Sequence, residues 1–271
     1  MRILITGSTV HARQYIESFM FDRGISLLFL PDRTNRISET IESYGIRTTS
    51  RTEIAEHLNS FDAVVVANLA GEKLSVLRFL SESGYAGNCI IEKPFAIDEA
   101  SFQKKTELLN DNRYVVAYSR QLYKQEILEK VKEARNMHNS LLWPNFNELG
   151  IDMVRDTLPH VLDFLFIANE GKIFNLIIED ISSSALHFTA FFSGTSYHVT
   201  VYNTVSDNDF VKLNNTIFDW PNYFIYNPKM LHRLMTDNGF VEENNRANRT
   251  INKLYSKSVH DIASLIPPSR P

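Results

Sequence analysis

The first twelve residues, "MRILITGSTVHA" (residues 1–12), decide the fold of the amino-terminal half of the chain. Met1–Thr6 has the continuous apolar character of a buried strand, and Val10–Asp22 carries apolar residues at helical spacing. A strand, a glycine turn and a helix in this order are typical of the site where a dinucleotide pyrophosphate meets a helix N-terminus. The stretch therefore predicts a phosphate-binding turn.

This turn departs from the usual spacing of G-x-G-x-x-G or G-x-G-x-x-A. Gly7 fills the first position and Ala12 the third, but Thr9 takes the second. The threonine side chain would either push a pyrophosphate outward or bind it through its hydroxyl, and loss of cofactor binding is the competing interpretation. The cofactor contacts expected from the turn are Gly7, Ser8, Thr9, Val10 and His11.

Outward from the turn, short apolar runs alternate with amphipathic segments up to about residue 120. Continuous β-branched runs between helices are typical of a parallel sheet that is covered on both faces. We therefore expect a Rossmann-type, doubly wound domain over residues 1–120. Its further strands are expected at residues 25–30, 63–67, 89–91 and 114–117, and its helices at residues 38–44, 51–58, 74–83 and 99–109.

The second expected strand ends in "FLPDRTNR" (residues 29–36), where the choice between NAD and NADP is usually made. Asp32 could bind a ribose 2′-hydroxyl, which favours NAD. Arg33 and Arg36 could instead bind a 2′-phosphate, which favours NADP. Both signals are present, so either NAD or NADP is expected.

The pattern changes over residues 121–271, where long strands follow one another with little helix between them. The sequence predicts a smaller α+β domain with a mainly antiparallel sheet, serving substrate binding or oligomerisation. Residues 140–150 read as a loop. Strands are expected at residues 173–182, 185–192, 196–204 and 210–213, and helices at residues 124–137, 156–169 and 248–265.

Composition narrows the possible partners. The net charge is −4 at pH 7, which gives no electrostatic case for binding nucleic acid or an anionic membrane. Cys89 is the single cysteine, and the eight histidines show no metal-ligand spacing, so no disulfide and no metal site is expected. No run approaches the roughly 20 apolar residues of a membrane span. A cytoplasmic protein is expected.

Polar residues follow the ends of several expected strands, where the cofactor crevice of such a sheet opens. The polar residues are Asn68, Glu92, Lys93 and Arg120, and these four and the apolar Leu69 that follows Asn68 are expected to contact the cofactor. The Lys93 ammonium could also hydrogen-bond the oxygen of a reacting alcohol or carbonyl and stabilise its developing charge. The competing interpretation is a surface lysine before a proline that starts a helix.

A second catalytic candidate lies in "DTLPHVLDFL" (residues 156–165). Asp156 and His160 are four residues apart, so both project from one face of a helix. A histidine titrates near neutral pH and could pass a hydroxyl proton, while Asp156 orients it or binds substrate. Alternatively, Asp156 caps a helix that has Pro159 in its first turn, and His160 is structural.

These motifs together resemble the glucose–fructose oxidoreductase, inositol dehydrogenase and MocA family of two-domain oxidoreductases. The resemblance runs in order over about residues 1–170. It rests on "DAVVVANLAGEKLSVLRFLSESGYAGNCIIEKP" (residues 62–94), on "YVVAYSRQLY" (residues 114–123), and on the D-x-x-x-H helix with its later acid at Asp163. It implies hydride transfer between NAD(P) and a sugar, sugar nucleotide, cyclitol or similar small compound, with Lys93, His160 and Asp156 as catalytic residues.

Departures from the family keep two other functions open. The glycine turn is altered, and the family's T/S-P-N-x-x-H stretch is here Asn68-Leu69-Ala70-Gly71-Glu72-Lys73. A dinucleotide-sensing or regulatory protein without turnover is one alternative, and a reductase of a non-sugar carbonyl or imine is the other. Eighteen phenylalanines, with "HFTAFF" (residues 187–192) in one strand, favour a covered sheet face and hence a homo-oligomer.

Overall fold

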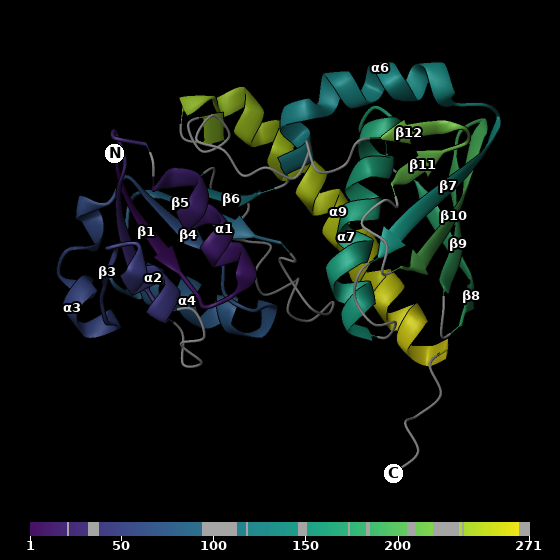
Figure 1. Ribbon diagram of the computed structural model, residues 1–271. Coiled ribbons are helices and arrows are strands. Elements are labelled where there is room, and N and C mark those ends of the chain that lie inside the picture. Colours follow the sequence, from purple (N-terminus) through teal and green to yellow (C-terminus); the bar gives the residue numbers. More distant parts are fainter. Residues whose placement is uncertain are drawn as a thin grey trace, which may run out of the picture. The chain divides into compact units, whose positions relative to one another are not determined.

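The computed structural model (Figure 1) forms two compact units, and each is described by itself. Unit 1 comprises Met1–Ile97, Gln103–Tyr118 and Ile225–Asn248, and the rest of the chain forms unit 2. Residues 225–248 thus cluster with unit 1, although the boundary predicted at residue 120 assigns them to the second domain; that boundary stays a prediction. The structure describes residues 1–20, 22–31, 38–93, 113–117, 119–145, 151–172, 174–182, 185–204, 210–218, 233–234 and 236–265.

Unit 1 contains a six-stranded sheet in the order β3-β2-β1-β4-β5-β6, and every pairing in it is parallel. This is the strand order of the doubly wound dinucleotide-binding fold, so the predicted fold class of this half is confirmed. The strands are β1 (Arg2–Thr6), β2 (Ser26–Leu30), β3 (Arg47–Thr48), β4 (Ala63–Val66), β5 (Asn88–Glu92) and β6 (Tyr114–Ala117).

The helices of unit 1 follow the strands as the apolar pattern predicted (Figure 1). The first of them buries Tyr15, Ile16 and Phe19 completely, which anchors it to the apolar strands. The predicted helix at residues 99–109 lies outside the described residues. The helices are α1 (Val10–Phe19), α2 (Ser38–Ser43), α3 (Arg51–Ala55), the 3₁₀ turn η1 (Leu58–Ser60) and α4 (Ala70–Glu82).

Side chains of helix α9 (Asn238–Leu265) hydrogen-bond backbone carbonyls of the edge strand β6. Asn245 Nδ2 donates to the Tyr114 carbonyl at 3.2 Å, and Asn244 Nδ2 donates to the Val116 carbonyl. The Arg113 carbonyl accepts from the Cys89 nitrogen of β5. Successive carbonyls of a strand point to opposite sides, so those of Tyr114 and Val116 point away from β5. The asparagines therefore satisfy backbone acceptors that an open edge would leave unpaired.

Unit 2 is built around a second six-stranded sheet, in the order β12-β11-β7-β10-β9-β8. Its pairings are antiparallel except that β7 and β10 run parallel, so the predicted mainly antiparallel sheet is confirmed. The strands are β7 (His138–Asn145), β8 (Asn175–Ile181), β9 (Ala185–Phe192), β10 (Thr195–Asn203), β11 (Val211–Leu213) and β12 (Thr216–Phe218).

Strand β7 corrects the predicted loop at residues 140–150. Residues 140–145 lie in a central strand of the sheet, and residues 146–150 lie outside the described residues. Pro144 obscured the strand in the sequence, because proline removes a ladder hydrogen bond and is unusual inside a sheet. Leu141 and Trp143 are buried, so burial of alternate apolar side chains favours the strand despite the proline.

Helix α7 (Ile151–Ala168) packs against the sheet of unit 2 through aromatic contacts. The Phe164 ring meets Trp143 of β7 at 6.0 Å and Phe218 of β12 at 5.1 Å, both edge to face. The helix begins five residues before Asp156, so the alternative in which Asp156 caps it is wrong. Pro159 lies inside the helix and not in its first turn. The other helical elements of unit 2 are η3 (Ser119–Tyr123), α6 (Lys124–Ala134) and the later part of α9.

Candidate functional site

The turn between β1 and α1 depends on Gly7. Its φ is +107°, a conformation that side-chain-bearing residues avoid. A Cβ at this position would lie 2.7 Å from the carbonyl carbon and oxygen of Ala67 and from the Asn68 nitrogen. Gly7 therefore lets the chain pass directly over the end of β4 and start α1 three residues later. A tight turn at this point is the role of the first glycine in a phosphate-binding turn of a doubly wound sheet.

Thr9, in place of the second glycine, directs its hydroxyl toward the protein. Oγ1 donates to the Ala67 carbonyl at 2.7 Å and accepts from the Ala12 nitrogen at 3.3 Å. Thr9 is thereby the N-cap of α1 and satisfies one of the backbone N–H groups at the helix start. The side chain stabilises the turn, while the first turn of α1 keeps the positive end of the helix dipole.

Asn68 and Leu69 follow β4, at the edge of the sheet where the carboxyl ends of the strands lie (the carboxyl edge). Asn68 is 5% exposed, and its Oδ1 accepts from the Thr6 hydroxyl at 2.6 Å. This bond orients the amide so that its NH₂ group is left for other partners. Leu69 is 57% exposed, an apolar surface beside a polar anchor. Such a pair suits a flat ring with a hydrogen-bonding rim.

Three buried charged groups gather near the carboxyl edge of unit 1. Glu92 ends β5 and Lys93 follows it, while Lys73 comes from α4, and all three are at most 5% exposed. Glu92 Oε2 accepts from the Tyr15 hydroxyl of α1 at 2.9 Å, whereas Oε1 is buried and has no hydrogen-bond partner among the described residues. A buried carboxylate oxygen in this state is expected to take a donor from outside the protein chain.

The pKa of His11, in the first turn of α1, depends on these charges. Burial lowers the pKa of His11, Glu92 raises it, and Lys93 and Lys73 lower it further. The imidazole is therefore favoured in its neutral form near pH 7. A neutral His11 ring adds no charge to the start of α1, where phosphate is expected.

The fold of unit 2 brings four polar side chains together. We call these four residues, Arg120, Gln121, His160 and Asp163, the Arg120 cluster. Arg120 and Gln121 come from η3, and the other two from α7. Arg120 Nη1 lies 3.3 Å from Asp163 Oδ2, and Gln121 Nε2 donates to Asp163 Oδ1 at 2.6 Å. Arg120 Nη2 also contacts His160 Nδ1.

Asp163 is the buried anion of this cluster, with no exposed surface. Burial raises the pKa of its carboxyl, and Arg120 and the hydrogen bond from Gln121 oppose that shift. Both carboxyl oxygens face donors, which is the pattern of an ionised carboxylate. The guanidinium also lies 5.7 Å from the centre of the Trp143 ring, an additional cation–π contact.

The sequence-predicted site residues thus divide between the units. Gly7, Ser8, Thr9 and His11 lie in or beside the turn, and Asn68, Leu69, Glu92 and Lys93 lie at the carboxyl edge. Arg120, predicted as a cofactor contact, is in unit 2 with His160, and its guanidinium is engaged by protein partners. Asp32, Arg33 and Arg36, and the side chains of Val10 and Asp156, lie outside the described residues.

Sequence reasoning did not select Lys73, Gln121 or the Arg120–Asp163 pair. Lys73 lies in α4, which begins four residues before the predicted helix at residues 74–83, and it is 1% exposed. The signal for the pair was present in the D-x-x-x-H-x-x-D spacing, which places Asp163 three residues after His160. The partner is 43 residues away in sequence and could not be read from periodicity.

The chain thus contains a Rossmann domain and a mainly antiparallel α+β domain. This is the fold of the Gfo/Idh/MocA oxidoreductases, as the sequence resemblance predicted. No protein-family model matches the sequence, and no curated protein matches it. Across the described residues, no helix is long and apolar enough to cross a membrane.

Particular solved structures share this fold over their whole length. Myo-inositol dehydrogenase from Lactobacillus casei, in complex with NAD(H) and myo-inositol, aligns with a TM-score of 0.69 at 15% identity, covering 100% of this chain and 98% of that one. The WlbA dehydrogenase from Thermus thermophilus, in complex with NAD and alpha-ketoglutarate, gives 0.69 at 13%, covering 100% and 97%. A Gfo/Idh/MocA family oxidoreductase from Vibrio cholerae gives 0.67 at 13%, covering 97% and 99%. At these identities the likeness establishes the fold.

Proposed function

We propose that the protein is an NAD(P)-dependent oxidoreductase that acts on a sugar, sugar nucleotide, cyclitol or similar small hydroxy or keto compound. The observation that carries this proposal is the Gly7 turn, which runs into α1 beside a carboxyl edge that holds Asn68 and Lys93. Two dehydrogenases of the same fold were solved with NAD or NAD(H), which supports the same cofactor class here.

The turn residues fit a dinucleotide. Gly7 allows the close backbone approach, and α1 offers its positive end to a pyrophosphate. Asn68 and Leu69 would border the nicotinamide half, and Glu92 has a buried oxygen ready to accept a donor. When bound, the cofactor would supply or accept the hydride; the protein supplies orientation and charge.

Lys93 and His160 are proposed to act on the reacting oxygen. The Lys93 ammonium would hydrogen-bond that oxygen and stabilise its negative charge, and His160 would be a further hydrogen-bonding partner of the substrate. Asp156 remains proposed as a further contact to substrate or to His160. Asp32 and Arg33 remain the proposed determinants of NAD against NADP.

The test is a turnover assay that follows the reduced nicotinamide over a panel of inositols, hexoses and nucleotide sugars, in both directions. Lys93→Ala and His160→Ala should each lower kcat/KM by about 10²-fold or more. The matched controls are Lys132→Ala on α6 and His57→Ala, both exposed side chains, which should leave the rate unchanged. Full turnover in the Lys93→Ala variant would contradict its catalytic role.

One observation favours a second candidate, a dinucleotide-sensing protein without turnover. Thr9 keeps its β-branched side chain at the position where glycine is wanted, and its hydroxyl is bonded to Ala67 and Ala12 rather than directed outward. A pyrophosphate would then be held less closely than over two glycines. Cofactor binding with no turnover across the panel would favour this candidate.

We also propose that the protein assembles with further copies of itself through the sheet of unit 2. Ile177, Phe191 and Ile217 are 42–55% exposed. Strand register places them on the face opposite to Phe188 and Phe218, which are buried. Ile177 and Phe191 lie on the neighbouring strands β8 and β9, and exposed apolar side chains that adjoin on a sheet face favour a covered surface. Light scattering of wild type and of Ile177→Lys/Ile217→Lys tests this, because the variant should shift to the monomer.

A further inference from the structure

The contact between Arg120 and His160 determines which ring nitrogen of His160 carries a proton. A guanidinium carries five N–H donors and no acceptor. The histidine nitrogen that faces it must therefore accept, and in the structure this nitrogen is Nδ1. A proton on Nδ1 would point a second donor, and a second positive charge, at the Arg120 cation.

A neutral imidazole carries a single N–H, so acceptance at Nδ1 places that proton on Nε2. Nε2 is then a hydrogen-bond donor. It cannot also accept the proton of a substrate hydroxyl, because its lone pair is already used by the N–H bond.

Arg120 is held rigidly enough to impose this choice. Its side chain is 1% exposed, and Asp163 at 3.3 Å neutralises its charge. Gln121 fixes the other oxygen of that carboxylate at 2.6 Å, and the Trp143 ring lies beside the guanidinium at 5.7 Å. The guanidinium therefore has little freedom to turn away from His160.

We propose that Arg120 is a positioning residue that holds His160 as the neutral tautomer protonated at Nε2, so that His160 meets a ligand oxygen as a donor. The role toward a ligand rests on the proposed oxidoreductase function, but the tautomer does not. This assignment changes the division of labour expected from the sequence. His160 then polarises a carbonyl or holds an alcohol oxygen as a hydrogen-bond donor, and it is not the base that takes the hydroxyl proton.

The direct test is NMR of the full chain labelled with ¹⁵N-histidine, without cofactor or substrate, using long-range ¹H–¹⁵N correlations near pH 7. His160→Gln identifies the signal to be assigned. The expected spectrum has a protonated Nε2 and an unprotonated Nδ1. A proton on Nδ1, or on both nitrogens, would overturn the proposal.

Two variants separate positioning from structure. Arg120→Lys keeps a donor toward Nδ1 and should keep the tautomer. Arg120→Met/Asp163→Leu removes donor and buried charge together, which such clusters tolerate when packing is kept. In this double variant a measurable fraction of the Nδ1–H tautomer should appear, because a free neutral imidazole populates both forms with Nε2–H the more abundant, and kcat should fall about 10²-fold with a smaller change in KM. A folded double variant, checked by circular dichroism, that shows no more of the Nδ1–H tautomer than the wild type would contradict the role of Arg120.

The results of these experiments test the His160 tautomer separately from the proposed oxidoreductase function. Failure to bind any nicotinamide dinucleotide would remove the oxidoreductase proposal and leave the tautomer measurement standing. A protonated Nδ1 in an active enzyme would remove the tautomer assignment and leave the oxidoreductase proposal standing. If the double variant does not fold, the wild-type and Arg120→Lys spectra still decide the question.

Discussion

The β1–α1 turn of unit 1 and the Arg120 cluster of unit 2 are both candidate sites, but they are built by opposite means. The turn is a backbone structure, set by the left-handed conformation of Gly7 and capped by Thr9. The cluster is a side-chain structure, set by a buried ion pair between residues 43 apart in sequence. A backbone site tolerates changes in side-chain chemistry but not in volume, whereas the cluster should respond in the opposite way.

The largest expected effect comes from breaking the ion pair of the cluster. Asp163→Asn keeps the volume but leaves the Arg120 charge buried without its counter-ion, and it should lower the free energy of unfolding by about 3–5 kcal/mol. Urea denaturation measures this change. The control is Arg120→Met/Asp163→Leu, which should recover most of the loss; a loss in the double variant as large as in the single one would contradict the electrostatic explanation.

The turn should instead fail when volume is added. Gly7→Ala places a Cβ 2.7 Å from the backbone of Ala67 and Asn68 and strains a φ of +107°, which together should cost about 3 kcal/mol of stability. The matched control is Gly71→Ala in α4, where an added Cβ meets nothing within 4 Å. That variant should keep stability or raise it by up to about 1 kcal/mol. Equal effects of the two substitutions on urea unfolding would refute the close-approach argument.

Removing the cap of the turn should have a smaller effect. Thr9→Val keeps the shape but loses the bonds to Ala12 and Ala67, and it should cost about 1 kcal/mol of unfolding free energy. Thr9→Ser retains both bonds and should remain near the wild type. If the valine variant were as stable as the serine variant, the hydroxyl would have no capping role.

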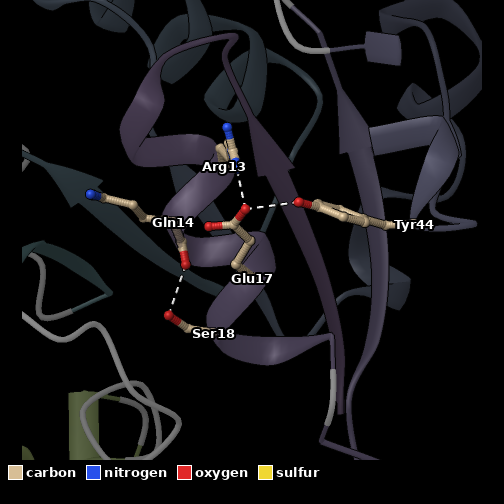
Figure 2. Close-up of polar contacts among 5 residues, drawn as sticks. All are labelled: Arg13, Gln14, Glu17, Ser18 and Tyr44. Atoms are coloured by element: carbon tan, nitrogen blue, oxygen red, sulfur yellow. Dashed lines mark hydrogen bonds and ion pairs between the residues drawn. The ribbon is translucent and has the colours of Figure 1, made fainter. Parts of the chain in front are cut away.

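The smallest effect is expected on the outer face of α1. Figure 2 shows Glu17 between Arg13 and Tyr44. Glu17 Oε1 lies 2.6 Å from Arg13 Nε and 2.8 Å from the Tyr44 hydroxyl. The hydrogen bond from Arg13, and then that from Tyr44, lower the pKa of Glu17. Its contribution to stability is therefore present above the ordinary pKa of 4.5 and is lost as the pH falls through the lowered value.

Glu17→Gln should leave urea unfolding at neutral pH almost unchanged, because exposed ion pairs are screened by solvent. It should also remove a small loss of stability on acidification below the ordinary pKa. A loss at neutral pH comparable with that of Asp163→Asn would show that exposure does not decide the strength of these pairs.

The same contrast explains what could be predicted from the sequence. Gly7, the apolar strands and the helix start are local features, and local periodicity predicted them. Strand β7 was missed because Pro144 is a local signal against a strand, whereas burial of Trp143 is a tertiary effect. The partner of Asp163 was missed for the same reason, since packing and not spacing brings Arg120 to it.

The most direct test of the central claim, that the Gly7 turn binds a nicotinamide dinucleotide, is calorimetric titration of the protein with NAD, NADH, NADP and NADPH. We predict binding with a Kd in the micromolar range for one of the two pairs, weakened in Lys93→Ala and unchanged in Lys132→Ala. If none of the four dinucleotides gave binding heat, the claim would be contradicted.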